Sequence, residues 1–251
     1  MALFENESLE TGNKGDLSIL EAQLLKFAER LAAANKIITI ETLYKEISQN
    51  PIGPEEEISQ AIYHLILKKY IVVGSKITRR QVLLNENRNR IYQHVLKIPG
   101  CHLSEIKQFM GMKGQLAKWH LAVLEKFDYV FSLRYLKYLT YFPNEFDENY
   151  VVPYLSLKNE NSYQIFSTLW ENPVLTLVDL KILLPMELPT LKYHLNKLID
   201  SKVVQIQVKN NQSYYLLNRD VLFPLQQFLN INQEELLNFF QYQDTVFREK
   251  C

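Results

Sequence analysis

The chain has 251 residues, of which 47% are hydrophobic, and its 28 basic and 28 acidic side chains give no formal net charge. This length can form one large hydrophobic core or several small ones. No apolar run reaches the ~18 residues that a membrane span needs, and the two cysteines, Cys101 and Cys251, have neither metal-ligand spacing nor the pattern of a disulfide framework. The sequence therefore argues against a membrane protein, a disulfide-stabilised secreted domain and a cysteine-based metal site.

The N-terminal third begins with a polar, acidic stretch, residues 1–15, which resembles neither a signal peptide nor a transit peptide. We expect a disordered tail there and a cytoplasmic protein. Residues 16–80 then have the pattern of three helices and a stunted strand, with Thr39 as a helix cap and Pro54 at the start of the third helix. The acids Glu55–Glu57 suit the positive end of a helix dipole but would repel phosphates. This part is therefore a better candidate for packing or for binding a protein partner than for reading DNA.

Residues 81–143 read as a helix, a short helix, a tight turn, a helix and a β-ribbon. The spacing predicts the short helix over Leu103–Met110 and the next helix over Gln115–Phe127, with a turn at residues 111–114 between them. Two strands rich in Tyr, Phe and Leu follow. This is the layout of a winged helix-turn-helix, whose second helix enters the DNA major groove.

The same pattern recurs in residues 158–218 at a constant offset of 74 and without a gap. A gap-free register over both helices and into the strands indicates a repeated supersecondary unit. The matched pairs include Pro99 and Pro173, His102 and Thr176, Ile106 and Leu180, Lys118 and Lys192, His120 and His194, Leu124 and Leu198, and Val130 and Val204.

A weaker copy lies in residues 16–80. Thr39 matches His102 at an offset of 63, whereas Ile62 and Ile71 match Leu121 and Val130 at an offset of 59. The difference falls in the turn at residues 50–53, where extra residues are tolerated. The triplet Tyr63-His64-Leu65 resembles Trp119-His120-Leu121 and Tyr193-His194-Leu195 but lies three residues out of this register, and we prefer the spacing to the triplet.

These patterns predict a mainly α-helical fold with small β-wings, of the α+β class. The expected arrangement is three tandem winged helix-turn-helix domains and a C-terminal helix. We place the domains at residues 16–80, 81–143 and 158–218, a linker at 144–157 and a helical extension at 219–251. The extension has an apolar stripe, for which two uses remain open: packing on the third domain, and homodimerisation through this helix or through the wings. The stripe consists of Leu236, Leu237, Phe240 and Phe247.

The basic charge is concentrated in residues 81–143, which hold nine Lys or Arg and four Asp or Glu. Such a patch can steer DNA to one face, and an ordinary solvated surface is the alternative explanation. Gln and Lys read base edges, and Lys also neutralises phosphates. The candidate DNA-binding residues of this second copy are Lys113, Gln115, Lys118 and Trp119, with Arg134 and Lys137 in its wing. Those of the third copy are Thr190, Lys192 and Asn196 on its helix, and Lys209 and Asn210 at its wing tip.

Two residues of the second copy have structural explanations as well. Trp119 can be a half-buried aromatic residue beside the core, and the Tyr and Phe residues of the wing can serve sheet packing or a dimer surface. We interpret His120 as a packing residue with one hydrogen-bonded nitrogen rather than as a ligand.

The second and third copies resemble the winged-helix transcriptional regulators of prokaryotes, of the broad ArsR/MarR type. The resemblance is carried by Pro99-Gly100 before residues 102–106, and by the pattern Lys-aromatic-His-Leu-x-x-Leu at residues 118–124 and 192–198. Tandem copies of this kind are familiar in archaeal proteins. The resemblance implies a regulator that binds double-stranded DNA, with the recognition helix of the second copy as the main reader. The third copy departs from the family because its recognition helix is less basic than usual.

A protein-protein scaffold is the second hypothesis, because the subunits of the ESCRT-II sorting complex are also built of tandem winged helices. A neutral chain with an acidic first copy is compatible with such a role. Convergence of Lys113, Lys118, Arg134 and Lys137 on one open surface favours DNA, and scattered or covered cations favour the scaffold. An enzyme, a cofactor and a metal are not expected, since the sequence has no phosphate-binding loop, HExxH, CxxC or nucleophile motif.

Overall fold

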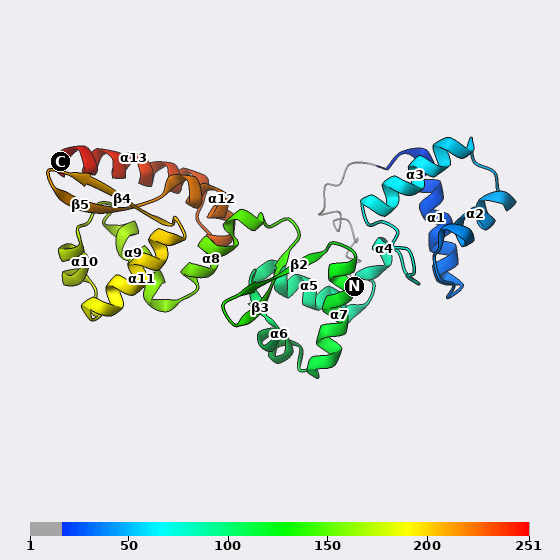
Figure 1. The fold of residues 1–251 in the computed structure, drawn as a ribbon, viewed down its shortest axis with the longest axis horizontal. Coiled ribbons are helices and arrows are strands. Elements are labelled where there is room, and N and C mark those ends of the chain that lie inside the picture. Colours follow the sequence, from blue (N-terminus) through cyan, green and yellow to red (C-terminus); the bar gives the residue numbers. More distant parts are fainter. Residues whose placement is uncertain (1–16, 251) are drawn as a thin grey trace, which may run out of the picture. The chain divides into compact units, whose positions relative to one another are not determined.

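The computed structural model describes residues 17–250, so the expected tail at residues 1–15 lies outside the described part. The chain divides into two compact units, Met1–Glu145 and Phe146–Cys251. The described residues are mainly helical, with a three-stranded and a two-stranded antiparallel sheet (Figure 1), and this confirms the predicted fold class. No helix among residues 17–250 combines the length and the apolar character needed to span a bilayer.

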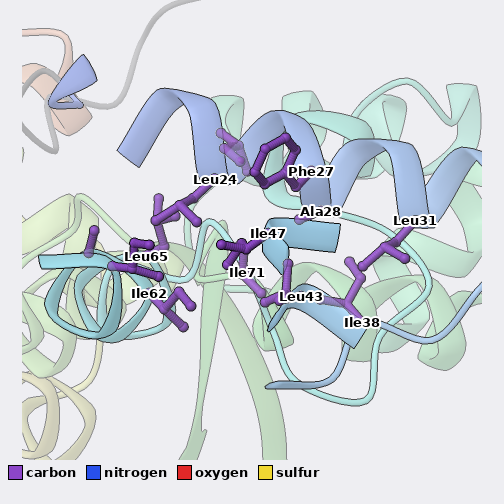
Figure 2. Close-up of a cluster of buried hydrophobic side chains, with 13 residues drawn as sticks. Leu24, Phe27, Ala28, Leu31, Ile38, Leu43, Ile47, Ile62, Leu65 and Ile71 are labelled. Atoms are coloured by element: carbon purple, nitrogen blue, oxygen red, sulfur yellow. The ribbon is translucent and has the colours of Figure 1, made fainter. Parts of the chain in front are cut away.

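The first repeat, residues 16–80, begins with three helices around a core of its own. Ser18 and Thr39 cap the first two helices with their side-chain oxygens, and Pro54 precedes the third. Figure 2 shows the buried hydrophobic side chains of this core, which include the aromatic ring of Phe27. A single bridge between Ile38 and Ser75 stands in place of a wing. The helices are α1 (Ile19–Ala33), α2 (Ile40–Gln49) and α3 (Glu55–Leu67).

The second repeat, residues 81–143, has the predicted helix, turn, helix and ribbon. His102 caps the short helix α6, and Gly111 ends it in the left-handed conformation at φ +62°. Its strands form a sheet in the order β1-β3-β2. The elements from residue 79 to residue 143 are α4 (Arg79–Val82), α5 (Glu86–Lys97), β1 (Cys101–His102), α6 (Leu103–Met110), α7 (Gly114–Lys126), β2 (Val130–Tyr135) and β3 (Tyr138–Pro143).

The second unit holds the third repeat and the C-terminal helices. Residues 144–157, expected as a linker, are instead largely helical, and α8 buries Val151 and Tyr154 in this unit. A segment that buries this much apolar surface is packed into the unit and is not an extended linker between domains. The elements are η1 (Glu148–Tyr150), α8 (Val151–Leu157), α9 (Glu160–Glu171), α10 (Leu177–Leu183), α11 (Leu188–Asp200), β4 (Val204–Lys209), β5 (Gln212–Leu217), α12 (Arg219–Leu229) and α13 (Gln233–Lys250).

Helix α13 packs against the third repeat with much of its apolar stripe. The ring of Phe239 stacks on Trp170 at a centroid distance of 4.3 Å, and Leu236 and Phe240 are buried. The amide of Gln243 donates to the carbonyl of Leu217 and accepts from its N–H, both at 3.1 Å. Of the two uses expected for this stripe, packing on the third repeat therefore accounts for its buried residues, whereas Leu237 remains exposed.

The offset of 74 residues holds for whole elements. Helices α5 and α9, helices α7 and α11, strands β2 and β4, and strands β3 and β5 each begin and end 74 residues apart. Helix α3 precedes α7 by 59 residues at both ends, as the preferred spacing of the first repeat requires. We call α3, α7 and α11 the recognition-position helices. Their buried side chains coincide in this register: Ile58, Ala61, Ile62 and Leu65 in α3; Ala117, His120, Leu121 and Leu124 in α7; Leu191, His194, Leu195 and Leu198 in α11.

The turn before α7 provides a test of this architecture. Gly111 has a positive φ but open space where a Cβ would lie, so its substitution strains only the backbone. We expect Gly111→Ala to lower the free energy of unfolding by about 1 kcal/mol, measured by urea denaturation. Gly53→Ala is the matched control, because Gly53 also has open space but no positive φ. Equal stability of the two variants would contradict the assigned turn.

Candidate nucleic-acid interface

Helix α7 presents one buried face and one polar, exposed face. Its buried residues recur at positions i, i+3, i+4 and i+7, which leaves the rest of the helix surface to solvent. Lys113, Gln115, Lys118 and Trp119 are all exposed, and Trp119 keeps 54% of its surface accessible. The four residues predicted from the sequence therefore lie on or directly before one helix, outside its packing stripe.

The start of α7 also favours an anion electrostatically. The first turn of a helix carries partial positive charge on its unpaired N–H groups. No acidic side chain lies in the first turn of α7, and the cap residue Lys113 makes no side-chain capping bond. The aliphatic part of Lys107 lies over Gly114, where a Cβ would approach its Cδ to 3.2 Å. Cationic side chains thus flank a helix end that is itself positive.

The wing of the second repeat adds two exposed cations. Arg134 stands on β2 opposite Leu139, and Lys137 lies in the turn to β3 with its Nζ 5.3 Å from the centre of the Tyr138 ring. Among the described residues, Lys113, Lys118 and Arg134 make no ion pair, so their charges are not neutralised within the chain. The four cations whose exposure distinguishes DNA binding from a scaffold role are all exposed: Lys113, Lys118, Arg134 and Lys137.

The third repeat offers a less basic surface. Lys192 and Asn196 are exposed on α11 and Thr190 is half-buried, but Glu187 caps this helix. At its wing tip Lys209 is exposed, and Asn210, like Asn211, has a positive φ, as the predicted hairpin turn requires. Helices α10 and α11 also carry exposed apolar side chains, namely Val178, Ile182, Leu183 and Tyr193.

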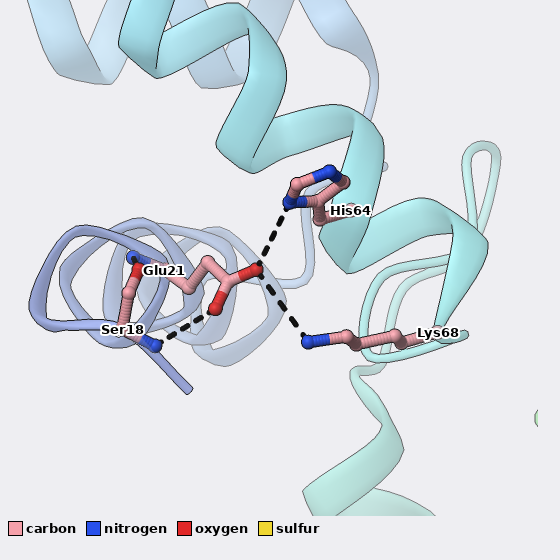
Figure 3. A network of polar contacts seen from close by, with 4 residues as sticks. All are labelled: Ser18, Glu21, His64 and Lys68. Atoms are coloured by element: carbon pink, nitrogen blue, oxygen red, sulfur yellow. Dashed lines mark hydrogen bonds and ion pairs between the residues drawn. The ribbon is translucent and has the colours of Figure 1, made fainter. Parts of the chain in front are cut away.

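The recognition-position helix of the first repeat is the most acidic, and two basic side chains near its C-terminal end lie close to a carboxylate. Figure 3 shows Glu21 of α1 between two side chains of the α3 region. Its carboxylate lies 3.6 Å from Nδ1 of His64 and 3.8 Å from Nζ of Lys68, and it accepts a hydrogen bond from the N–H of Ser18. The exposed acids at residues 55–57 begin the same helix. The charges of α3 therefore oppose phosphate contact.

His120 packs in the buried stripe of α7, as expected, but the expected hydrogen bond to one of its nitrogens is not formed. Its side chain is 3% exposed, and neither ring nitrogen has a hydrogen-bond partner among the described residues. Burial lowers the pKa of His120, and the nearby positive charge of Arg88 lowers it further. In the third repeat the equivalent His194 is satisfied at both nitrogens, by Ser162 Oγ and by Asn161 Nδ2, each at 3.2 Å.

Arg88 is a buried cation that was not predicted from the sequence. Its side chain is buried at the start of α5, and its Nε donates to the carbonyl of Val82 at 2.7 Å. Burial lowers the pKa of Arg88. The signal was available in the repeat itself, because the offset of 74 places Arg88 at the position of Ser162, the partner of His194.

The two buried histidines predict a pH dependence of stability. Both have pKa values below the ordinary value, by burial first and then by the charge of Arg88 or Lys197. Because the unfolded chain takes up protons first when the pH falls below about 6.5, acidification favours unfolding. We expect the unfolding free energy, measured in urea, to fall between about pH 7 and pH 5, and to fall less in His120→Leu. An equal pH dependence in this variant would show that His120 stays uncoupled from folding.

No family model matches the chain. Over 146 residues, 58% of its length, the chain is 32% identical to an uncharacterised HTH-type transcriptional regulator from the archaeon Methanocaldococcus jannaschii. The aligned part is 37% of that protein, so the chain spans little more than a third of its relative's length. More than half of the chain is therefore similar to part of a helix-turn-helix regulator.

Proposed function

We propose that the chain is a DNA-binding transcriptional regulator built of three tandem winged helix-turn-helix domains, in which α7 is the main reader of the major groove. The observation that carries the proposal is the contrast between the recognition-position helices. Only α7, among α3, α7 and α11, has no acidic residue at its cap or in its first turn. Its lysines are exposed and unpaired within the described chain.

The division into three domains is supported by the common buried face of α3, α7 and α11 and by their constant offsets. Each of these helices closes a core with the helices before it. A unit that repeats its packing in this way is the expected product of duplication. The similarity to an HTH-type regulator over 58% of the chain supports the same assignment, and the resemblance to the ArsR/MarR type remains part of the proposal.

The proposed contacts follow from chemistry. Gln115 and Lys118 would read base edges, while Lys113 and the N–H groups of the first turn would hold a phosphate. Arg134 and Lys137 in the wing would contact phosphate or enter the minor groove. A weaker set would come from the third repeat, with Thr190, Lys192, Asn196, Lys209 and Asn210. Trp119, on the same exposed face, would pack against the DNA backbone or a base edge.

A protein-binding role is the second candidate. The exposed apolar residues on α10 and α11, such as Val178 and Ile182, and the acidic start of α3 favour a protein partner more than DNA at these two sites. Since α13 buries Leu236 and Phe240 in its own unit, homodimerisation would use the wings or the exposed side of α13, where Leu237 and Tyr242 lie. The two roles are compatible when different repeats perform them.

The test is fluorescence anisotropy with a labelled random duplex at ~50 and ~200 mM salt. We expect binding that weakens steeply with salt. Lys113→Ala/Lys118→Ala should weaken binding at low salt and reduce the slope of log K against log salt by about one, because Lys113 is the phosphate contact of the pair. Lys26→Ala/Lys45→Ala, which removes two exposed charges from the first repeat, is the matched control and should bind as the wild type does.

Two outcomes would contradict the proposal. Unchanged affinity and slope in Lys113→Ala/Lys118→Ala would remove α7 from the interface. No binding at micromolar protein in low salt would exclude the regulator and favour the protein-binding role, which a search for protein partners would then pursue.

A further inference from the structure

Beside the exposed face of α7 lies a buried cation that the fold satisfies only in part. Arg88 is 7% exposed, and its guanidinium has five N–H donors, of which Nε–H bonds to Val82. The side chain makes no other hydrogen bond and no ion pair within the described chain. Its guanidinium carbon lies 5.9 Å from the centre of the Trp119 ring. Burying an arginine without a counter-charge is costly, because the charge loses its hydration.

The neighbouring His120 also lacks hydrogen-bond partners for its side chain. Both its nitrogens are buried without a partner among the described residues, and its ring lies 4.9 Å from that of Trp119. A buried polar group left without a hydrogen bond costs about 1–3 kcal/mol. Arg88 is close enough for its charge to act on His120. Two buried side chains with unpaired nitrogens thus lie next to the same exposed aromatic side chain, that of Trp119.

In the third repeat, the equivalent histidine has hydrogen-bond partners within the chain. There Ser162 replaces the arginine, and Ser162 and Asn161 bond to the two nitrogens of His194. In the first repeat, Ala61 stands at the histidine position and leaves no polar group to satisfy. The unpaired nitrogens of Arg88 and His120 are therefore specific to the second repeat and do not follow from the fold that the three repeats share.

We propose that Arg88 and His120 bind an oxyanion, a phosphate or a carboxylate group, beneath the exposed face of α7. Two guanidinium nitrogens can donate in parallel to the two oxygens of such a group. Neutral His120 adds one N–H, since one of its nitrogens carries a proton in either tautomer. The anion would supply the counter-charge and the acceptors that the chain itself lacks. Trp119 is close to both residues and partly exposed to solvent, so an anion bound there would change the environment of its indole ring.

Two sources can supply this group: a free small anion or a phosphate of bound DNA. Binding of a free anion does not depend on the proposed function, whereas occupation by a DNA phosphate rests on it. A site filled by a free anion would place an effector directly against the reading helix. A site filled by DNA would make Arg88 one more phosphate contact.

Trp119 is a built-in reporter for the first measurement. The chain has two tryptophans, and Trp170→Phe leaves Trp119 as the sole one. Sodium phosphate, and in a second series sodium acetate, would be titrated into this variant at constant ionic strength set with sodium chloride. We expect a saturable change in Trp119 emission with at least one of the two anions.

Substitution of the arginine tests the assignment. Arg88→Ser, which introduces the residue of the third repeat, should weaken anion binding at least tenfold in the Trp170→Phe background. Arg90→Ser is the matched control, because Arg90 lies on the same helix but is exposed, and it should leave binding unchanged. If Arg88→Ser fails to fold by circular dichroism, Arg88→Lys replaces it. This variant keeps the charge but loses the two-pronged donor geometry, and it should also bind more weakly.

A duplex distinguishes the two sources. If a DNA phosphate fills the site, inorganic phosphate will compete with the duplex beyond its ionic-strength effect, and Arg88→Ser will lose one phosphate contact in the salt dependence. If the ligand is a free anion, phosphate will still bind to the DNA-bound protein. A chain that binds no DNA leaves the anion titration fully readable. Two outcomes would overturn the proposal. The first is a linear, non-saturating response to both anions without DNA, together with an unchanged salt slope of DNA binding in Arg88→Ser. The second is equal anion binding by Arg88→Ser and by its Trp170→Phe parent.

Discussion

The buried stripe of the recognition-position helices is the constraint on which most of the structure depends. Four side chains, at positions i, i+3, i+4 and i+7, hold each of these helices on the core of its repeat. Burial of such a stripe is the main source of stability for an amphipathic helix. Because these four positions provide the packing, the exposed positions of the helix are free to change. The three helices can therefore differ in charge and polarity without any change in how they pack.

This freedom explains why one fold carries three different surfaces. Helix α3 begins with acids, α7 begins with lysine and glycine, and α11 begins after a glutamate beside exposed apolar residues. A fold alone does not specify a function, which lies in the outward residues. A neutral chain is thus compatible with DNA binding, since its charge is segregated between repeats rather than absent.

Much of the fold follows from the sequence because the repeats agree with one another. The offset of 74 residues places both ends of α11, β4 and β5 once those of α7, β2 and β3 are known. The helical nature of residues 151–157 did not follow, because they come after an acidic, irregular stretch, contain Pro153, and are helical in a way that depends on tertiary packing. The outward residues of α7 were predicted from helix geometry. The Arg88–His120 pair was not, since it requires the register of two helices at once.

The contact of Gln243 with Leu217 has a consequence for the sheet of the second unit. A side-chain amide that both donates to and accepts from one backbone residue occupies the place of a neighbouring strand. It pairs with the backbone of the last residue of β5, while the ring of Phe247 in α13 packs on Tyr214 of the same strand. Unpaired strand edges attract other chains and promote aggregation. Helix α13 therefore protects this edge of the sheet. A unit that ended before α13 would expose both an unpaired strand end and an uncovered apolar surface to other chains.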